Sequence, residues 1–382
     1  MHPSPNRNRN PTSILHVCAG NQYGGVESML VGIARHTVST PALSHAFASC
    51  FDGRLSTELR EAGIPVHRLP AVRLSRPWEI LRARAALRHL LADTRPSVVI
   101  THSAWTRLAF GRSLVAQGAP TVAWIHGAAS PVSRMDRWGQ RPHPDLVLLN
   151  SRHTGDLTRE LFPGAPREVL HCPVPAPPPI PPGTRDSLRR SLGAPPARTV
   201  ILVAARMEPW KGHDLLFDGL SRIPGDSDWV CWIAGGPQTT EQERHRDHLV
   251  RRAQSSGLAG RFAFLGERKD VPHLMTAADL YCQPNLGPEP FGIVLVEALY
   301  AGLPVVTTAL GGALEIVDDS CGRLVPPGDA TALAQTLAAL VEDPDLRARL
   351  GAGGPARAVD LCDPAGRIGQ LHDFLSNLPA GE

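Results

Sequence analysis

The chain has 382 residues, which is long for one domain and predicts two. It carries 39 lysines and arginines against 36 aspartates and glutamates, so its formal net charge is +3. Because the basic residues are scattered, nucleic acid is not an expected partner, although a mild basic excess favours anionic ligands.

The sequence predicts a cytoplasmic protein. Residues 1–11 lack the apolar core of a secretory signal and are expected to form a disordered leader. The most apolar long stretch, residues 292–317, is interrupted by Glu297 and Glu315, so no membrane span is expected. The seven cysteines include no C-x-x-C pair, which indicates buried reduced thiols rather than disulfides or a zinc site.

Short apolar runs alternate with amphipathic stretches along the chain, which is typical of a parallel α/β sheet. In the first half, the expected strands are 14–19, 98–101, 121–125 and 145–149. In the second half, they are 199–204, 229–234, 261–265, 280–283, 304–307 and 323–325. Each half therefore predicts an open, doubly wound sheet that binds ligands beyond the carboxyl ends of its strands.

The domain boundaries follow from a proline-rich run in the middle of the chain. Residues 12–172 and 199–364 are the expected domains, and residues 173–198 are the expected connector, because proline removes backbone donors. A proline-rich ligand for an aromatic groove is the less favoured interpretation. Apolar residues at helical spacing predict a last amphipathic helix over 365–378, and residues 365–382 are expected to pack back on the first domain.

Two candidate sites lie in the first half. The loop 20–27 carries Gly24 and Gly25 before a helix expected from about Ser28, where backbone N–H groups can approach a phosphate or sugar closely. An ordinary strand-to-helix turn would also explain these glycines. His126 and His102 each follow an apolar run at a strand end, where a histidine can be functional or merely structural.

In the second half, Arg206 and Lys211 follow the first strand on a loop that enters a helix. Two cations together with a helix N-terminus would attract a diphosphate, although a solvated surface pair is the alternative.

The segment 289–297 is the most informative one in the chain. Glu289 precedes a helix expected from Ile293, and Glu297 lies inside that helix between apolar neighbours. A buried carboxylate needs a hydrogen-bonding partner. Eight helical residues span about 12 Å, so the two carboxylates could contact opposite ends of one elongated ligand. A diphosphate between two hydroxyl-bearing rings, as in a nucleotide sugar, fits this arrangement.

With these motifs in order, the chain resembles the retaining GT-B glycosyltransferases of family 4, also called glycosyl transferases group 1. The matching pieces span nearly the whole chain: 24–27, Arg206, 211–213, 235–237, 264–266, 277–279, 289–297, 298–306, 311–312 and 322–326. The resemblance implies two Rossmann-like domains that face each other across a deep cleft. The first domain would bind the acceptor and the second the donor.

The resemblance also implies roles for individual residues. The implied catalytic residues are His126, Glu289, Arg206 and Lys211. The implied donor-binding residues are Gly24, Gly25, Arg206, Lys211, Phe291, Gly292, Ile293, Val294 and Glu297. The cations and the helix N-terminus would hold the diphosphate, Glu297 the ribose, and Glu289 and His126 the sugar.

The implied activity is transfer of a hexose-type sugar from a nucleotide-sugar donor, as in polysaccharide biosynthesis. A UDP-sugar is favoured and a GDP-sugar is next, with a glycan, lipid-linked or small-molecule acceptor and with no metal or other cofactor. A non-hydrolysing nucleotide-sugar epimerase and a catalytically silent sugar-nucleotide-binding subunit are the alternatives. The arginine-rich stretch 82–90 allows peripheral contact with the inner face of a membrane, or is simply a solvated helix face. Residues 171–174, His-Cys-Pro-Val, depart from the family pattern, so no contact is carried over there.

Overall fold

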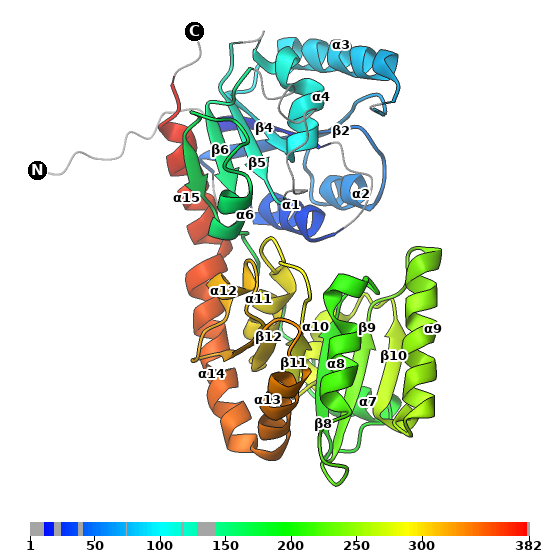
Figure 1. Cartoon of the computed structure of the whole chain (residues 1–382). Helices are drawn as coiled ribbons and strands as arrows, with labels where there is room; N and C mark the ends of the chain where they lie inside the picture. The colour runs from blue at the N-terminus through cyan, green and yellow to red at the C-terminus, as the bar shows by residue number, and fades with distance from the viewer. Residues whose placement is uncertain are drawn as a thin grey trace, which may run out of the picture. The chain divides into compact units, whose positions relative to one another are not determined.

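The structure is a computed structural model that describes residues 11–18, 24–36, 41–73, 75–115, 118–127 and 142–379. The chain forms two compact units, of which one comprises Met1–Pro175 with Cys362–Glu382 and the other comprises Ala176–Leu361. Each unit contains one parallel β-sheet with helices packed on it (Figure 1). The predicted α/β class with two doubly wound sheets is confirmed.

The first unit has a seven-stranded sheet in the order β3-β2-β1-β4-β5-β6-β7, whose order reverses between β1 and β4. Its strands are β1 (Thr12–Cys18), β2 (Leu43–Ser49), β3 (Val66–Arg68), β4 (Val98–His102), β5 (Thr121–Ile125), β6 (Leu146–Leu149) and β7 (Arg167–Val169). Its helices include α1 (Gly25–His36), α2 (Arg54–Glu61), α3 (Pro77–Thr94), α4 (Ala104–Val115), α6 (Arg152–Leu157) and α15 (Pro364–Ser376).

The second unit has a six-stranded sheet in the order β10-β9-β8-β11-β12-β13, which reverses between β8 and β11. Its strands are β8 (Thr199–Ala204), β9 (Trp229–Ala234), β10 (Phe262–Gly266), β11 (Leu280–Gln283), β12 (Val305–Thr308) and β13 (Gly322–Val325). Its helices include α7 (Thr184–Ser191), η2 (Pro209–Lys211), α8 (His213–Leu220), α9 (Thr240–Ser255), η3 (Ala259–Arg261), α10 (Val271–Ala277), α11 (Ile293–Tyr300), α12 (Ala313–Ile316), α13 (Ala330–Glu342) and α14 (Pro344–Cys362).

Every strand predicted from the sequence is present, with ends that differ by no more than about two residues, although Ala19 lies outside the described residues. The sequence did not predict β2, β3 or β7. Strand β2 has the sequence LSHAFAS, in which polar residues interrupt the apolar run, and β3 and β7 are only three residues long. Strands of this kind lack the continuous hydrophobic signal of a buried parallel strand.

Helix α7 lies within residues 173–198, the range in which the sequence predicted a connector. Arg185 and Arg189 of this helix bind the carboxylate of Asp279 at 2.5 and 3.0 Å. These ion pairs hold α7 against the loop before β11, so α7 belongs to the second unit, which begins at Ala176.

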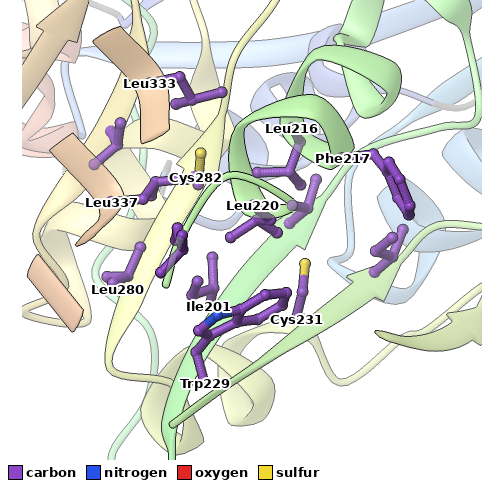
Figure 2. Close-up of a cluster of buried hydrophobic side chains, with 14 of the residues drawn as sticks. Ile201, Leu216, Phe217, Leu220, Trp229, Cys231, Leu280, Cys282, Leu333 and Leu337 are labelled. Atoms are coloured by element: carbon purple, nitrogen blue, oxygen red, sulfur yellow. The ribbon is translucent and has the colours of Figure 1, made fainter. Parts of the chain in front are cut away.

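The core of the second unit lies between its sheet and helices α8 and α13. Leu216 and Leu220 of α8 and Leu333 and Leu337 of α13 occur at i, i+4 spacing and belong to the same buried cluster as Ile201 of β8 (Figure 2). All five side chains are almost completely buried. Burying a leucine or isoleucine of this kind stabilises a fold by about 1.5–3 kcal/mol.

In the first unit, helices α3 and α4 cover one face of the sheet. Leu15 and Val17 of β1 point into this apolar layer together with Leu87 of α3. Since side chains alternate along a strand, His16 lies on the opposite face. Helix α15 from the end of the chain contacts α1 of the same unit.

No helix among the described residues is long and apolar enough to cross a membrane. All seven cysteines are buried thiols, as the sequence predicted.

Candidate functional site

Lys211 and Glu289 meet at the point where the strand order of the second sheet reverses. Lys211 ends the short helix η2 after β8, and Glu289 lies in the loop after β11, the strand that neighbours β8. The Nζ atom of Lys211 lies 2.5 Å from Oε2 of Glu289. The crevice beyond the carboxyl ends of strands at such a switch point is the usual ligand site of an open α/β sheet.

The Glu289 carboxylate is held by further donors from the end of β11. Its Oε2 atom accepts hydrogen bonds from Asn285 Nδ2 at 3.1 Å and from Gln283 Nε2 at 3.4 Å. Within the described part of the chain, these bonds and the lysine all reach Oε2, and Oε1 has no donor. The remaining oxygen is therefore available to a hydroxyl group of a ligand.

Two glycines allow the loops around Glu289 to pack closely. Gly212 has φ 77°, and a Cβ there would lie 1.8 Å from the carbonyl oxygen of Pro284. A Cβ on Gly312 would lie 2.4 Å from the carbonyl oxygen of Phe291. The N–H group of Gly312 donates a hydrogen bond to the Glu289 carbonyl at 2.8 Å. The position of the ion pair is therefore fixed by backbone contacts that only glycine permits.

The structure does not bring Arg206 into contact with Lys211 or Glu289. Its side chain is 44% exposed and lies 3.2 Å from the carboxylate of Glu208. An exposed ion pair of this kind contributes little stability, so an anionic ligand can compete for the guanidinium. Both predicted cations nevertheless follow the same strand, β8.

Helix α11 begins at Ile293, as the sequence predicted. Gly292 precedes it with φ 113°, so the chain turns sharply into the helix. The first N–H groups of a helix have no acceptor within it, and the helix dipole favours a negative charge at this end. The N–H groups of Gly292, Ile293 and Val294 are therefore suited to a phosphate, and the buried Phe291 anchors the turn.

Glu297 lies one turn into α11 with a partly buried side chain. Burial raises the pKa of Glu297 to about 7. Its carboxylate has no hydrogen-bond or ion-pair partner among the described residues, which is the situation that the sequence predicted for a ligand-binding carboxylate.

In the first unit, helix α1 starts at Gly25 rather than near Ser28. The Glu27 carboxylate accepts a hydrogen bond from the Gly24 N–H at 2.9 Å, and the Gly24 carbonyl accepts one from the Ser28 N–H at 3.0 Å. This arrangement resembles half of a capping box, and it starts the helix earlier than the apolar pattern indicates. Residues 20–23 of the predicted loop lie outside the described residues.

His126 is 8% exposed and follows β5 directly. Its Nε2 atom lies 2.9 Å from Nδ1 of His102, so the two histidines predicted at strand ends are in contact. Burial lowers the pKa of His126 to about 3, and the imidazole is neutral near pH 7.

Gln283 and Asn285, which donate hydrogen bonds to Glu289, were not predicted from the sequence. The available signal was a pair of polar residues at the end of an apolar strand, the same signal that identified His102. Two further histidines that join the His126 contact, His16 and His45, were also missed, the latter because β2 was not predicted.

The chain spans about half the length of the curated relatives it matches. It is 39% identical over 184 residues to a phosphatidyl-myo-inositol mannosyltransferase of Mycobacterium leprae, covering 47% of each chain. It is 30% identical over 260 residues to a D-inositol 3-phosphate glycosyltransferase of Mycolicibacterium smegmatis, covering 66% of this chain and 56% of the relative.

Among solved structures, Anabaena HepE in complex with UDP and glucose matches with a TM-score of 0.83 and 25% identity, covering 96% of this chain and 100% of HepE. Two family profiles also match, Glycosyltransferase Family 4 over residues 23–176 and Glycosyl transferases group 1 over residues 184–357. The fold and both halves of the sequence agree: the chain belongs to the family 4 glycosyltransferases and has the GT-B fold.

Proposed function

We propose that this protein is a retaining glycosyltransferase that moves a hexose-type sugar from a nucleotide-sugar donor to an acceptor hydroxyl. The observation that carries the proposal is the Lys211–Glu289 pair at the switch point of the second sheet. A lysine that is paired with a carboxylate but lies beside a helix N-terminus suits a ligand that combines negative charge with hydroxyl groups. A nucleoside diphosphate sugar is such a ligand.

In this proposal, Lys211, Arg206 and the N-terminus of α11 bind the donor diphosphate. Oε1 of Glu289 accepts hydrogen bonds from hydroxyls of the transferred sugar, and Glu297 accepts them from the ribose. A ligand that supplies these hydroxyls removes the cost of holding an unpaired carboxylate at Glu297. His126 is a further residue that would recognise the sugar in this proposal.

The proposed reaction breaks the bond between the anomeric carbon and the diphosphate oxygen, and the bonding electron pair leaves with the diphosphate. The acceptor oxygen forms the new bond to the anomeric carbon on the same face, and its proton passes to the departing diphosphate. Lys211 and Arg206 stabilise the charge that develops there, in the role that a metal ion plays in other enzymes. Independence from metals and other cofactors is part of the proposal.

The relatives guide the choice of donor and acceptor. HepE was solved with UDP and glucose, which supports a UDP-sugar as the first donor to test. A GDP-sugar is the next donor to test, and the mannosyltransferase relative supports mannose as the sugar that it carries. Both curated relatives act on inositol-containing acceptors by name, so an inositol-containing or lipid-linked alcohol is the acceptor class we favour.

The first experiment is a thermal-shift screen against UDP, GDP, ADP and their sugar conjugates, with EDTA present. A ligand that binds only the folded state raises the melting temperature, by an amount that grows with its concentration over Kd. We expect one nucleotide series to stabilise the wild type and to lose most of its effect in Glu297→Gln. No stabilisation by any nucleotide sugar would contradict the proposal, and conversion of the donor without an acceptor would indicate an epimerase.

We also infer that helix α3 contacts an anionic membrane surface. Trp78 is 59% exposed and Leu81 is 63% exposed, and both lie on one helix face with the exposed Arg82 and Arg88. Apolar side chains flanked by arginines on one helix face are the pattern of an interfacial helix. Arg84 does not belong to this face, because it donates to the backbone of α4 at Ala109. A cytoplasmic enzyme with this surface could reach lipid-linked acceptors.

A further inference from the structure

Four buried histidines cross the sheet of the first unit on one face. Their order across the sheet is His45 on β2, His16 on β1, His102 on β4, and His126 directly after β5. Each histidine lies two residues further along the chain than the residue that pairs with the preceding histidine. In the strand register, His45 pairs with Ile14, His16 pairs with Ile100, and His102 pairs with Trp124. A two-residue step keeps a side chain on the same face, so the four rings form a diagonal row.

The rings are joined by hydrogen bonds. His45 Nδ1 lies 2.9 Å from His16 Nε2, His16 Nδ1 lies 2.9 Å from His102 Nε2, and His102 Nδ1 lies 2.9 Å from His126 Nε2. Every contact therefore joins Nδ1 of one ring to Nε2 of the next. At the two ends, His45 Nε2 and His126 Nδ1 are buried and have no partner among the described residues.

The number of protons restricts the states of this histidine chain. Burial lowers the pKa of His45 to about 4 and that of His126 to about 3, and burial with neighbouring imidazoles lowers the pKa of His16 and His102 well below 6.5. Each neutral imidazole has one N–H and one bare nitrogen. Each of the three contacts needs one proton, so all four rings must carry the proton on Nε2, or all four on Nδ1.

We propose that the histidine chain acts as one unit that sets the tautomer of His126, with His102, His16 and His45 as positioning residues. In the Nε2–H state, His126 Nδ1 is a bare nitrogen that accepts a hydrogen bond. In the Nδ1–H state, the same atom is a donor. Naming the ligand of this atom as a donor-sugar hydroxyl, which can donate or accept, rests on the proposed function. The existence of the chain and its common tautomer does not.

The unpartnered ends argue for a role beyond packing. A buried polar atom without a partner costs free energy that an apolar side chain of similar size avoids. The surroundings are themselves partly apolar, since Phe47 stacks on His16 with ring centroids 4.6 Å apart. Between its two ends the histidine chain satisfies its own hydrogen bonds. A nitrogen at His126 that has no partner among the described residues is what a ligand-responsive group requires.

The test is NMR of the full chain labelled with nitrogen-15 at histidine, because ring nitrogen shifts distinguish the tautomers. In the free wild type, we expect all four rings to be neutral and to share one tautomer. Two adjacent rings with opposite tautomers, or a charged ring at neutral pH, would overturn the proposal. This measurement needs no substrate and no variant, so it stays decisive if the proposed function fails.

Addition of UDP-glucose then tests coupling along the chain. We expect the ring signals of His126 and His45 to change together, although only His126 would contact the sugar. In His16→Gln, whose amide can hydrogen-bond but cannot exchange tautomers, the His45 response should disappear. In the wild type, a change in the ring signals of His126 without a change in those of His45 would overturn the coupling. Absence of UDP-glucose binding in the thermal-shift screen would instead count against the donor assignment alone.

A kinetic comparison separates this role from stability. We expect His16→Gln to lower kcat/KM for transfer about tenfold. This is the effect of losing one well-placed hydrogen bond, here the one between His126 and the sugar. The control is Phe47→Leu, which loosens packing against His16 but keeps all four imidazoles. Equal losses of kcat/KM in the two variants would assign the chain a structural role only and overturn the proposal.

Discussion

The Nζ atom of Lys211 lies 2.5 Å from Oε2 of Glu289, although 78 positions separate the two residues in the sequence. The side chains are only 10% and 18% exposed, so each charge depends on the other in the ligand-free protein. In the proposed complex, the donor diphosphate would balance the charge of Lys211, and a sugar hydroxyl would hydrogen-bond to Glu289.

Lys211→Met should lower kcat for transfer about 100- to 1,000-fold, because the charge that develops on the diphosphate loses a preorganised cation. The measurement is steady-state transfer with the donor identified by thermal shift. Lys269→Met is the matched control, an exposed lysine of the same unit, and should retain wild-type activity. Wild-type turnover in Lys211→Met would contradict the proposed site.

Glu297→Gln should stabilise the ligand-free protein more at pH 8 than at pH 5. Burial raises the pKa of Glu297 to about 7, above its ordinary value of 4.5, so the folded state retains the proton longer. The stability linked to this proton is fully present below pH 4.5 and is lost as the pH rises through 7. Glutamine removes this dependence, which amounts to at most about 3 kcal/mol.

Chemical denaturation of both proteins across this pH range measures the difference. Parallel pH profiles for wild type and Glu297→Gln would show that the carboxylate is not raised in pKa. Since ribose hydroxyls favour the charged carboxylate, UDP should also bind the wild type more tightly at pH 8 than at pH 5.

Gly212→Ala should destabilise the protein by at least about 2 kcal/mol and reduce transfer, because the new methyl group would meet the Pro284 carbonyl and the backbone has a positive φ. Gly328→Ala is a closely matched control, with φ 74° and open space around the added Cβ. It should cost only about 1–2 kcal/mol, for the left-handed conformation alone. Equal losses of stability would mean that the close approach at Gly212 is unimportant.

The membrane surface on α3 predicts that the double variant Trp78→Ser, Leu81→Ser sediments less with vesicles containing anionic lipid. Loss of two exposed apolar side chains removes about 2–4 kcal/mol of interfacial binding. Val359→Ser, another exposed apolar position, serves as the control and should sediment like the wild type. Binding of the wild type to neutral vesicles as strongly as to anionic ones would contradict a role for Arg82 and Arg88.

The sequence by itself determined most of the strands and the segment 289–297. Apolar runs identify buried parallel strands because both faces of such a strand are covered. This local property predicted both ends of β8, β9 and β11 correctly. The start of α11 at Ile293 and the partial burial of Glu297 among apolar neighbours also followed from neighbouring residues alone. The sequence did not predict strand β2, because His45 and its polar neighbours interrupt the apolar pattern.

Only the tertiary structure decided which of these residues meet. The contact of Lys211 with Glu289 depends on β8 and β11 being neighbours, and the histidine chain depends on strand order and on a two-residue register step from His45 to His126. Helix α7 likewise joined the second unit through ion pairs to Asp279, far along the sequence. Composition and periodicity report how each segment is buried, whereas strand order and register arise from packing between segments, which no local pattern encodes.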